Sequence, residues 1–152
     1  MSLTIRVQTA DFSLADEYRV LAQDSRCGAV VTFTGLVREL PDAALTAMEL
    51  EHYPGMTEHV LEQLAQQAQQ QWQTGAITII HRVGKLALNE QIVFVGVAAP
   101  HRKAAFAAAM YVMDFLKTQA PFWKQELTAS GRYWVAAKAS DQEAQQQWQR
   151  DA

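Results

Sequence analysis

The stretch Gln-Ile-Val-Phe-Val-Gly-Val-Ala (residues 91–98) decides the fold class of this chain. It is nearly all apolar and rich in β-branched residues, which predicts a β-strand. Residues 77–83, a little earlier in the chain, predict another strand. After residue 98 come Pro-His-Arg-Lys (residues 100–103) and then a long helix through about Gln119. Strands and helices mixed in this way indicate a domain that contains both.

The rest of the chain continues the mixture of strands and helices. Further strands are predicted at residues 3–7, 28–35 and 45–53, helices at 13–22 and 57–72, and a hairpin from 123–128 and 132–137. Ser13 is expected to cap the first helix. No internal repeat or linker interrupts the pattern, so residues 1–152 are predicted to form one α+β domain with a mixed or antiparallel sheet. The polar tail from about residue 140 is expected to be helical or frayed.

The long helix carries an apolar stripe that is expected to face the core. Phe106, Ala109, Met110, Met113 and Leu116 recur at helical spacing. Methionines in such a stripe fill gaps in a hydrophobic core much more often than they line a ligand site. We therefore interpret the stripe as packing surface.

Composition narrows the class of protein. The 152 residues suit one domain, and a hydrophobic content of 49% with 19% charged residues is that of an ordinary globular protein. No apolar run is long enough to span a bilayer, and the N-terminus has no signal-peptide core. The single cysteine, Cys27, rules out an internal disulfide. A net charge of −3 gives no overall basic footprint for nucleic acid. These features predict a cytoplasmic protein that binds neither membrane nor nucleic acid.

The segment Lys-Thr-Gln-Ala-Pro-Phe-Trp-Lys (residues 117–124) carries the strongest chemical signal. Because Pro121 cannot continue a helix, Lys117 is expected to close the helix and Lys124 to begin an extended segment. Such a turn can bring both ammonium groups to one cleft, with Phe122 and Trp123 as its apolar wall. Two amines there repel each other, so at least one should lose its proton readily and act as acid, base or nucleophile. In the alternative interpretation, Lys117 only complements the helix dipole and Lys124 is a solvated strand residue.

A basic group at the start of the long helix is a candidate anion site. His101, Arg102 and Lys103 lie where the helix macrodipole is positive, which is unfavourable for cations alone. An anion held by the free N–H groups and the basic side chains would explain the placement. The alternative is that the three side chains extend into water. Arg38, just beyond a predicted strand, is a further candidate for binding a phosphate or carboxylate.

Several familiar sites are absent from the sequence. It has no G-x-G-x-x-G, Walker, G-x-S-x-G or H-E-x-x-H motif. The four histidines lack ligand spacing, so no metal site is predicted. Cys27 precedes a buried strand and is interpreted as a small apolar residue rather than as an activated sulfur carrier.

Six segments together resemble the catalytic, large subunit of molybdopterin synthase. They are residues 28–38, 50–56, 80–84, 92–97, 101–102 and 117–124. The resemblance extends over roughly residues 3–148 in the same order, and its specific part is the lysine motif 117–124. Two features differ from the family pattern. The loop after Arg38 is shorter than in many relatives, and position 36 is Leu where some relatives have a basic or polar residue.

The resemblance implies a sulfurtransferase of molybdenum-cofactor biosynthesis with an α/β hammerhead fold. Such enzymes convert cyclic pyranopterin monophosphate to molybdopterin by installing a dithiolene, and no cofactor is expected. The sulfur arrives as a thiocarboxylate on the C-terminal Gly-Gly of a small ubiquitin-like partner subunit. Members form homodimers of the large subunit with a small subunit at each end, which makes a heterotetramer.

The resemblance also assigns roles to residues. Lys117 and Lys124 match the catalytic lysines of the family, and Arg38, His101 and Arg102 match its anion-binding residues. In relatives the His-Arg pair comes from the other protomer, which implies a site completed across the dimer. The remaining substrate-binding residues implied for the same pocket are Leu36, Val37, Gln125 and Glu126.

Two rival hypotheses remain open from the sequence. The same basic residues would also serve a non-catalytic module that binds a phosphorylated ligand or the glycine tail of another protein. A scaffold without a small-molecule site is the second rival, and it predicts no anion at the start of the long helix.

Overall fold

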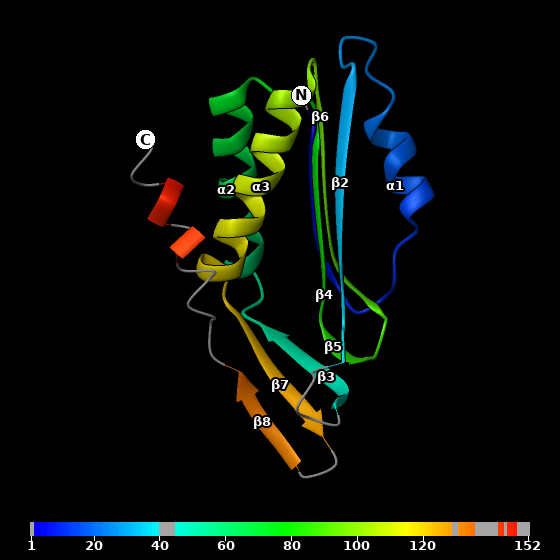
Figure 1. Cartoon of the computed structure of the whole chain (residues 1–152), viewed down its shortest axis with the longest axis vertical. Coiled ribbons are helices and arrows are strands. Elements are labelled where there is room, and N and C mark those ends of the chain that lie inside the picture. Colours follow the sequence, from blue (N-terminus) through cyan, green and yellow to red (C-terminus); the bar gives the residue numbers. More distant parts are fainter. Residues whose placement is uncertain (1, 40–44, 129–130, 136–142, 145, 149–152) are drawn as a thin grey trace.

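The computed structural model describes residues 2–39, 45–128, 131–135, 143–144 and 146–148 (Figure 1). Within these residues the chain forms two four-stranded sheets and three helices of at least two turns. In chain order the elements are β1 (Leu3–Gln8), α1 (Leu14–Leu21), β2 (Ala29–Leu36), β3 (Leu45–His52), α2 (Met56–Trp72), β4 (Ile77–Arg82), β5 (Gly84–Ala87), β6 (Gln91–Ala99), α3 (Arg102–Gln119), β7 (Phe122–Thr128) and β8 (Gly131–Val135). The predicted α+β class is confirmed.

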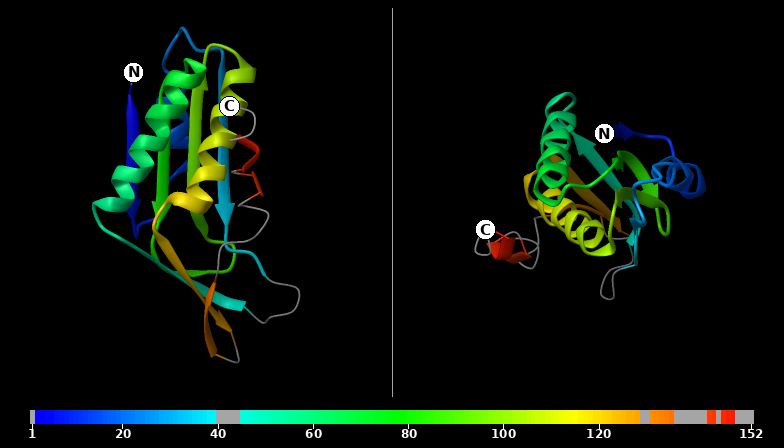
Figure 2. Two further views of the ribbon diagram at one scale, coloured as in Figure 1. Left: turned by 90° about the vertical axis from the view of Figure 1, so that its left-hand side faces the viewer. Right: turned by 90° about the horizontal axis from the view of Figure 1, so that it is seen from above.

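The first sheet has the strand order β1-β4-β6-β2 and is mixed. β1 and β4 are parallel, whereas β6 is antiparallel to both β4 and β2. Helices α2 and α3 cover one face and α1 covers the other, as Figures 1 and 2 show. Both faces of β6 are therefore covered, and its residues from Val93 to Ala99 are all buried. This explains why its sequence is apolar throughout instead of alternating.

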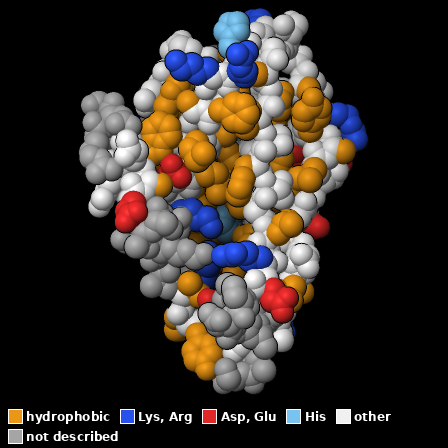
Figure 3. Space-filling model, viewed as in Figure 1, with side chains coloured by type: hydrophobic (Ala, Val, Ile, Leu, Met, Phe, Trp, Pro, Cys, Tyr) orange, Lys and Arg blue, Asp and Glu red, His pale blue; other side chains and the backbone are white. Residues whose placement is uncertain are grey.

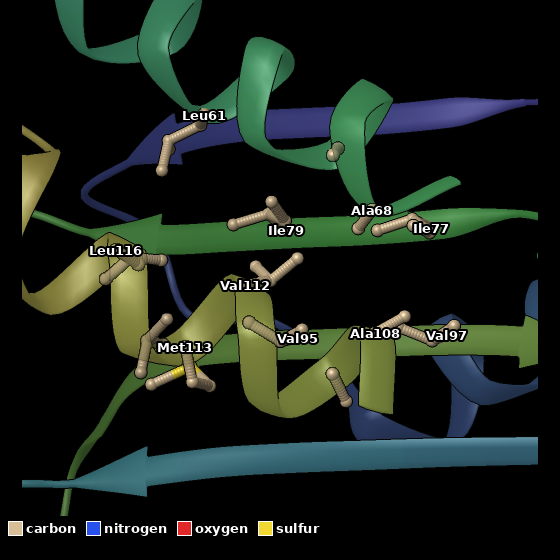
Figure 4. Close-up of a cluster of buried hydrophobic side chains, with 13 residues drawn as sticks. Leu61, Ala68, Ile77, Ile79, Val95, Val97, Ala108, Val112, Met113 and Leu116 are labelled. Carbon is tan, nitrogen blue, oxygen red and sulfur yellow. The ribbon is translucent and has the colours of Figure 1, made fainter. Parts of the chain in front are cut away.

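The main core lies between the first sheet and helices α2 and α3 (Figure 4). Ile77 and Ile79 of β4 face these helices, whereas Ile80 faces α1 on the other side of the sheet. This alternation follows from the two-residue period of a strand. On the α1 side, Ser13 caps the helix as predicted by accepting a hydrogen bond from the Asp16 N–H at 3.3 Å. None of the helices in the described residues is long and apolar enough to cross a membrane.

The predicted stripe of α3 is wrong at two positions. Phe106 and Met110 are 63% and 59% exposed, so they lie outside the core. The helix instead buries a face that contains three alanines, and the buried residues are Ala105, Ala108, Ala109, Val112, Met113, Phe115 and Leu116. The prediction chose the core face of α3 by hydrophobicity alone. Small side chains let a helix approach a sheet closely, so the alanine-rich face packs inward instead. Phe106 and Met110 remain as apolar side chains one turn apart on the surface.

The second sheet extends from the end of the helix layer where α3 ends (Figure 1). Its strand order is β5-β3-β7-β8, and all its neighbouring strands are antiparallel. The predicted hairpin is confirmed as β7 and β8, with Thr128 opposite Gly131, although residues 129–130 and 136–137 lie outside the described residues. The short strand β5 was not predicted. Most of the tail from residue 140 also lies outside the described residues, and its described residues, 143–144 and 146–148, are helical.

We predict that Gly96→Ala destabilises the fold at the contact between β6 and α1. An added Cβ would overlap Leu21 Cδ1 and come within 2.9 Å of the Phe94 ring. Forcing a methyl group into such a packed site costs about 1–3 kcal/mol, which urea unfolding would measure. Leu21→Ala removes the obstacle, so the double variant should lose less than the sum of the two single losses. Strict additivity would contradict this account.

Candidate active site

The junction between α3 and β7 places the two predicted lysines. Lys117 lies in the last turn of α3, and the backbone turns extended at Ala120, with φ −71° and ψ 131°. Pro121 follows, and Phe122 begins β7, so the predicted end of the helix is confirmed. Lys124 is the third residue of β7 and is half-buried, whereas Lys117 is exposed.

A buried threonine holds this junction in place. The Thr57 hydroxyl, in the first turn of α2, donates a hydrogen bond to the Pro121 carbonyl at 3.1 Å. The same oxygen accepts a hydrogen bond from the Tyr53 N–H at 3.1 Å. Thr57 is fully buried, so these hydrogen bonds do not compete with water. They fix the turn at Pro121 against the start of α2.

His81 is the buried polar group of the junction. It continues the row of Ile77 and Ile79 on the face of β4 that is covered by α2 and α3, and it is only 5% exposed. Its ring stacks on that of Phe122, with centroids 3.8 Å apart and an angle of 19° between the planes. Its Nδ1 lies 2.8 Å from the Arg82 carbonyl oxygen. The imidazole therefore links the end of β4 to the start of β7.

The charges of both lysines act on His81. Burial lowers the pKa of His81 to about 4, and the hydrogen bond to the Arg82 carbonyl only partly opposes this. The positive charges of Lys124, Lys117 and His52 lower the pKa further. Two lysines, from β7 and α3, and a histidine from β3 thus act on one imidazole. Figure 3 shows Lys and Arg side chains around a hollow at this end of the helix layer, with a histidine at its bottom.

Arg82 holds the end of β4 on the opposite side of the sheet. Its guanidinium donates hydrogen bonds to the Thr9 carbonyl at 3.0 and 3.2 Å and to the Gln91 carbonyl at 3.0 Å. It also forms an ion pair with Glu90 at 3.5 Å. Because its side chain is tied to the segment after β1 and to the start of β6, its carbonyl offers His81 a fixed acceptor.

The predicted pocket residues of β7 lie on opposite faces of their strand. Phe122, Lys124 and Glu126 alternate onto one face, and Gln125 points to the other. Glu126 is opposite Met48 of β3, whereas Gln125 is opposite Glu49. The structure thus places Glu126 with Lys124, and Gln125 away from both.

The three predicted residues at the end of β2 differ in exposure. Leu36 is 48% exposed and Arg38 is exposed, whereas Val37 is fully buried. The Val37 side chain packs in a small core with Leu50 and Leu86, so it supports this region from within. Leu50 is the partner of Lys124 in the sheet, which brings the chain around Val37 close to the lysine-bearing strand. The loop that follows, residues 40–44, lies outside the described residues.

His101 and Arg102 lie at the far end of α3 from the lysines. His101 precedes the helix and Arg102 is its first residue, and both are exposed. At 1.5 Å per residue, the fifteen residues from Arg102 to Lys117 separate them by about 22 Å along the axis. Figure 3 likewise shows a second basic group with a histidine at the upper end of the molecule, well above the hollow. One chain therefore does not bring this pair together with its own Lys117.

The sequence interpretation missed His81 and Thr57. It treated His81 as one of four scattered histidines, yet the two-residue period of the strand places it in the core-facing row of Ile77 and Ile79. That signal was present in the sequence. Thr57 offered no comparable signal, because its partner Pro121 is 64 residues away. Among the described residues, no three His, Cys, Asp or Glu side chains are grouped so as to hold a metal ion.

Known proteins resemble this chain over nearly its whole length. Residues 7–119 match the family model described as MoaE protein. A molybdopterin synthase catalytic subunit from Vibrio cholerae is 47% identical over 150 residues, which cover 98% of this chain and 100% of the relative. The solved structure of a molybdopterin biosynthesis MoaE protein from Burkholderia ambifaria is 48% identical, with a TM-score of 0.84 and coverage of 97% and 99%.

A more distant solved structure has the same fold. Molybdopterin synthase from Staphylococcus aureus is 31% identical to this chain, with a TM-score of 0.81, and the match covers 86% of this chain and 95% of that one. The fold and the lysine-bearing junction define a single-domain α+β protein with a cationic site at one end of its helix layer. The matches identify it further: the chain belongs to the MoaE family. The resemblance drawn from the sequence is therefore confirmed.

We predict that His81 makes the protein less stable in mild acid. Its folded pKa of about 4 lies below its ordinary value of 6.5, so between these values the unfolded chain binds a proton that the folded chain does not. The free energy of unfolding should therefore fall as pH decreases through this window, by about 2–3 kcal/mol at pH 4.5.

Urea unfolding at pH 7 and pH 4.5 would measure this effect. His81→Phe removes the titrating group, so its stability should fall by less between the two pH values than that of the wild type. His59→Phe changes an exposed residue of α2 and serves as the control, with the wild-type pH dependence. Equal losses in the His81 variant and the wild type would exclude His81 as the cause.

Proposed function

We propose that this chain is the catalytic subunit of a molybdopterin synthase, which converts cyclic pyranopterin monophosphate to molybdopterin by sulfur transfer. The observation that carries the proposal is the meeting of Lys117 and Lys124 around one buried imidazole at the α3–β7 junction. Relatives of equal length that are named as catalytic subunits of this enzyme support it. The rival hypotheses of a binding module and of a scaffold have no comparable support.

A separate sulfur carrier agrees with the chemistry of this chain. Burial, and next the negative charge of Asp24, raise the pKa of Cys27, so its thiol is a poor nucleophile at neutral pH. Cys27 is also the only cysteine of the sequence. The sulfur is therefore assigned to the C-terminal thiocarboxylate of a small ubiquitin-like partner subunit that ends in Gly-Gly. A free thiol of this kind also suits the reducing cytoplasm, where we place the enzyme.

The residues at the junction are suited to this reaction. The glycine tail of the partner would enter the hollow beside Lys117, and its sulfur would attack a side-chain carbon of the pterin and displace oxygen from it. Water would then hydrolyse the resulting thioester, which leaves the sulfur on the pterin and a carboxylate on the partner. Lys117 and Lys124 would move protons and stabilise the oxyanions that form. Arg38 and the His101–Arg102 pair would hold the substrate phosphate through charge-assisted hydrogen bonds. A second loaded partner would then deliver the second sulfur.

A homodimer would complete the site, and the heterotetramer would follow from one small subunit on each protomer. Met110 lies at the midpoint of α3, and it is exposed together with Phe106 on the same face and with Phe33 on the edge strand β2. A two-fold axis near Met110 would pack two α3 helices antiparallel and cover these apolar side chains. It would also bring His101 and Arg102 of one protomer to the Lys117 end of the other.

We predict that Lys117→Ala abolishes sulfur transfer without unfolding the protein. Loss of a general acid or base lowers kcat by about 100-fold to 10,000-fold, and Lys117 is exposed, so the fold should persist. The assay mixes purified protein with thiocarboxylated partner and cyclic pyranopterin monophosphate and measures dithiolene product. Lys85→Ala, at an exposed position of β5, is the matched control and should keep wild-type activity.

Two results would argue against the enzyme. Absence of product with the wild type would remove the proposed function. Wild-type protein that binds the pterin without forming product, with Lys117→Ala lowering only that affinity, would favour the binding module.

We also predict that two inactive variants restore each other. Lys117→Ala and Arg102→Ala homodimers should each be inactive, because each lacks one part of every site. After subunit exchange, half of the dimers are mixed, and each mixed dimer has one intact site. Activity should therefore return to about a quarter of the wild-type level. If Arg102 served the Lys117 of its own chain, the mixture would stay inactive.

A further inference from the structure

His81 is a buried titratable group to which the proposed chemistry gives no role. It lies where β4, α3 and β7 meet, and the charges that act on it come from Lys117, Lys124 and His52. The inference below rests on the proposed function, because it concerns how the lysines of that site are held.

The hydrogen bond to Arg82 fixes the tautomer of His81. A carbonyl oxygen can only accept a hydrogen bond, so Nδ1 must carry a proton in the 2.8 Å contact with the Arg82 carbonyl. Burial keeps the imidazole neutral above about pH 4. In a neutral imidazole with a protonated Nδ1, the Nε2 atom has a free lone pair and acts only as an acceptor.

Among the charges around His81, that of Lys124 acts most strongly, followed by Lys117 and His52. Lys124 also lies two residues after Phe122 on the same face of β7, so the ring stacked on His81 and the lysine share one side of the strand. The guanidinium of Arg82 points to the other face of the first sheet, where it binds Thr9 and Gln91. The donor side chains that act on the imidazole are therefore Lys124, Lys117 and His52, and Lys124 acts most strongly.

We propose that His81 is a positioning residue for Lys124. One face of its ring holds Phe122 and thereby the start of β7, and its Nε2 accepts a hydrogen bond from one of the three N–H groups of the Lys124 ammonium. An acceptor of this kind fixes the direction of the lysine side chain, which has four rotatable bonds, and favours its charged form. A cationic or donor side chain at this position could not do so.

Two variants separate the two parts of this role. His81→Phe keeps a flat ring that can stack on Phe122 but removes the acceptor. His81→Gln keeps an acceptor near the position of Nε2 but removes the ring. If the acceptor holds Lys124, His81→Phe lowers kcat by about 10-fold to 100-fold, the usual effect of losing a hydrogen bond to a charged group, with the KM for the pterin changed by less than about threefold. His81→Gln stays within about tenfold of the wild type.

The pH profile of kcat adds a readout that a purely structural role would not move. In His81→Phe the Lys124 ammonium lacks this acceptor and is less stabilised. The limb of the kcat profile in which Lys124 loses its proton therefore moves to lower pH, by about one unit. In His81→Gln and in the control His59→Phe, the limb stays in place. A His81→Phe enzyme with unchanged kcat and limb would overturn the proposal. Equal losses in both His81 variants without movement of the limb would also overturn it.

Nitrogen NMR tests the proposal without activity and without a variant. In wild-type protein labelled with ¹⁵N-histidine, His81 Nε2 should be unprotonated at neutral pH, and a proton on Nε2 would overturn the proposal. In lysine-labelled protein, the titration midpoint of Lys124 should be lower in His81→Phe than in the wild type and unchanged in His81→Gln. These measurements hold even if the wild type makes no dithiolene product, so failure of the proposed function and failure of this inference remain distinguishable.

Discussion

The turn at Pro121 is the constraint on which the site depends. Helix α3 belongs to the layer that covers the first sheet, whereas β7 belongs to the second sheet. Proline joins the two because it ends the helix and sets an extended path, and Thr57 ties its carbonyl to the start of α2. Without this break, Lys117 and Lys124 would continue along one helix on the first sheet. With it, the two lysines approach the same end of β4 from two different layers.

The neutrality of His81 allows several cations to share this small space. Like charges repel, and the buried ring of His81 is poorly solvated, so a proton on this ring near Lys117 and Lys124 would destabilise the fold. Burial and stacking on Phe122 remove the imidazole from water and keep it uncharged over the physiological range. The cost appears only in acid, where the folded chain resists a proton that the unfolded chain accepts. The buried neutral imidazole thus provides a fixed polar group beside the lysines, and it lowers the stability of the fold in acid.

The sequence predicted most elements because their periodicity is local. Of the eleven elements in the described residues, ten lie where alternation, helical spacing or runs of apolar and β-branched residues predicted them. The exception, β5, is only four residues long. The stripe of α3 was misplaced because hydrophobicity favours Phe106 and Met110, whereas close packing on the sheet favours the alanine face. Residue type and spacing also led to the lysine pair. The burial of His81 could have been predicted from its place in the row of Ile77 and Ile79, but its contacts could not, because Phe122 and the lysines come from distant parts of the chain.

The length of α3 is the reason why the proposed site would need a second chain. Its basic start and its lysine-bearing end are held about 22 Å apart by a rigid helix, so no side-chain movement can join them within one protomer. A single phosphate ester cannot contact both groups unless another copy supplies one of them. The exposed Met110 at the midpoint of the same helix offers the apolar contact that such a copy would cover. Met110, which was expected in the core, therefore lies where two antiparallel α3 helices would cross. A homodimer would explain both its exposure and the separation of Arg102 from Lys117.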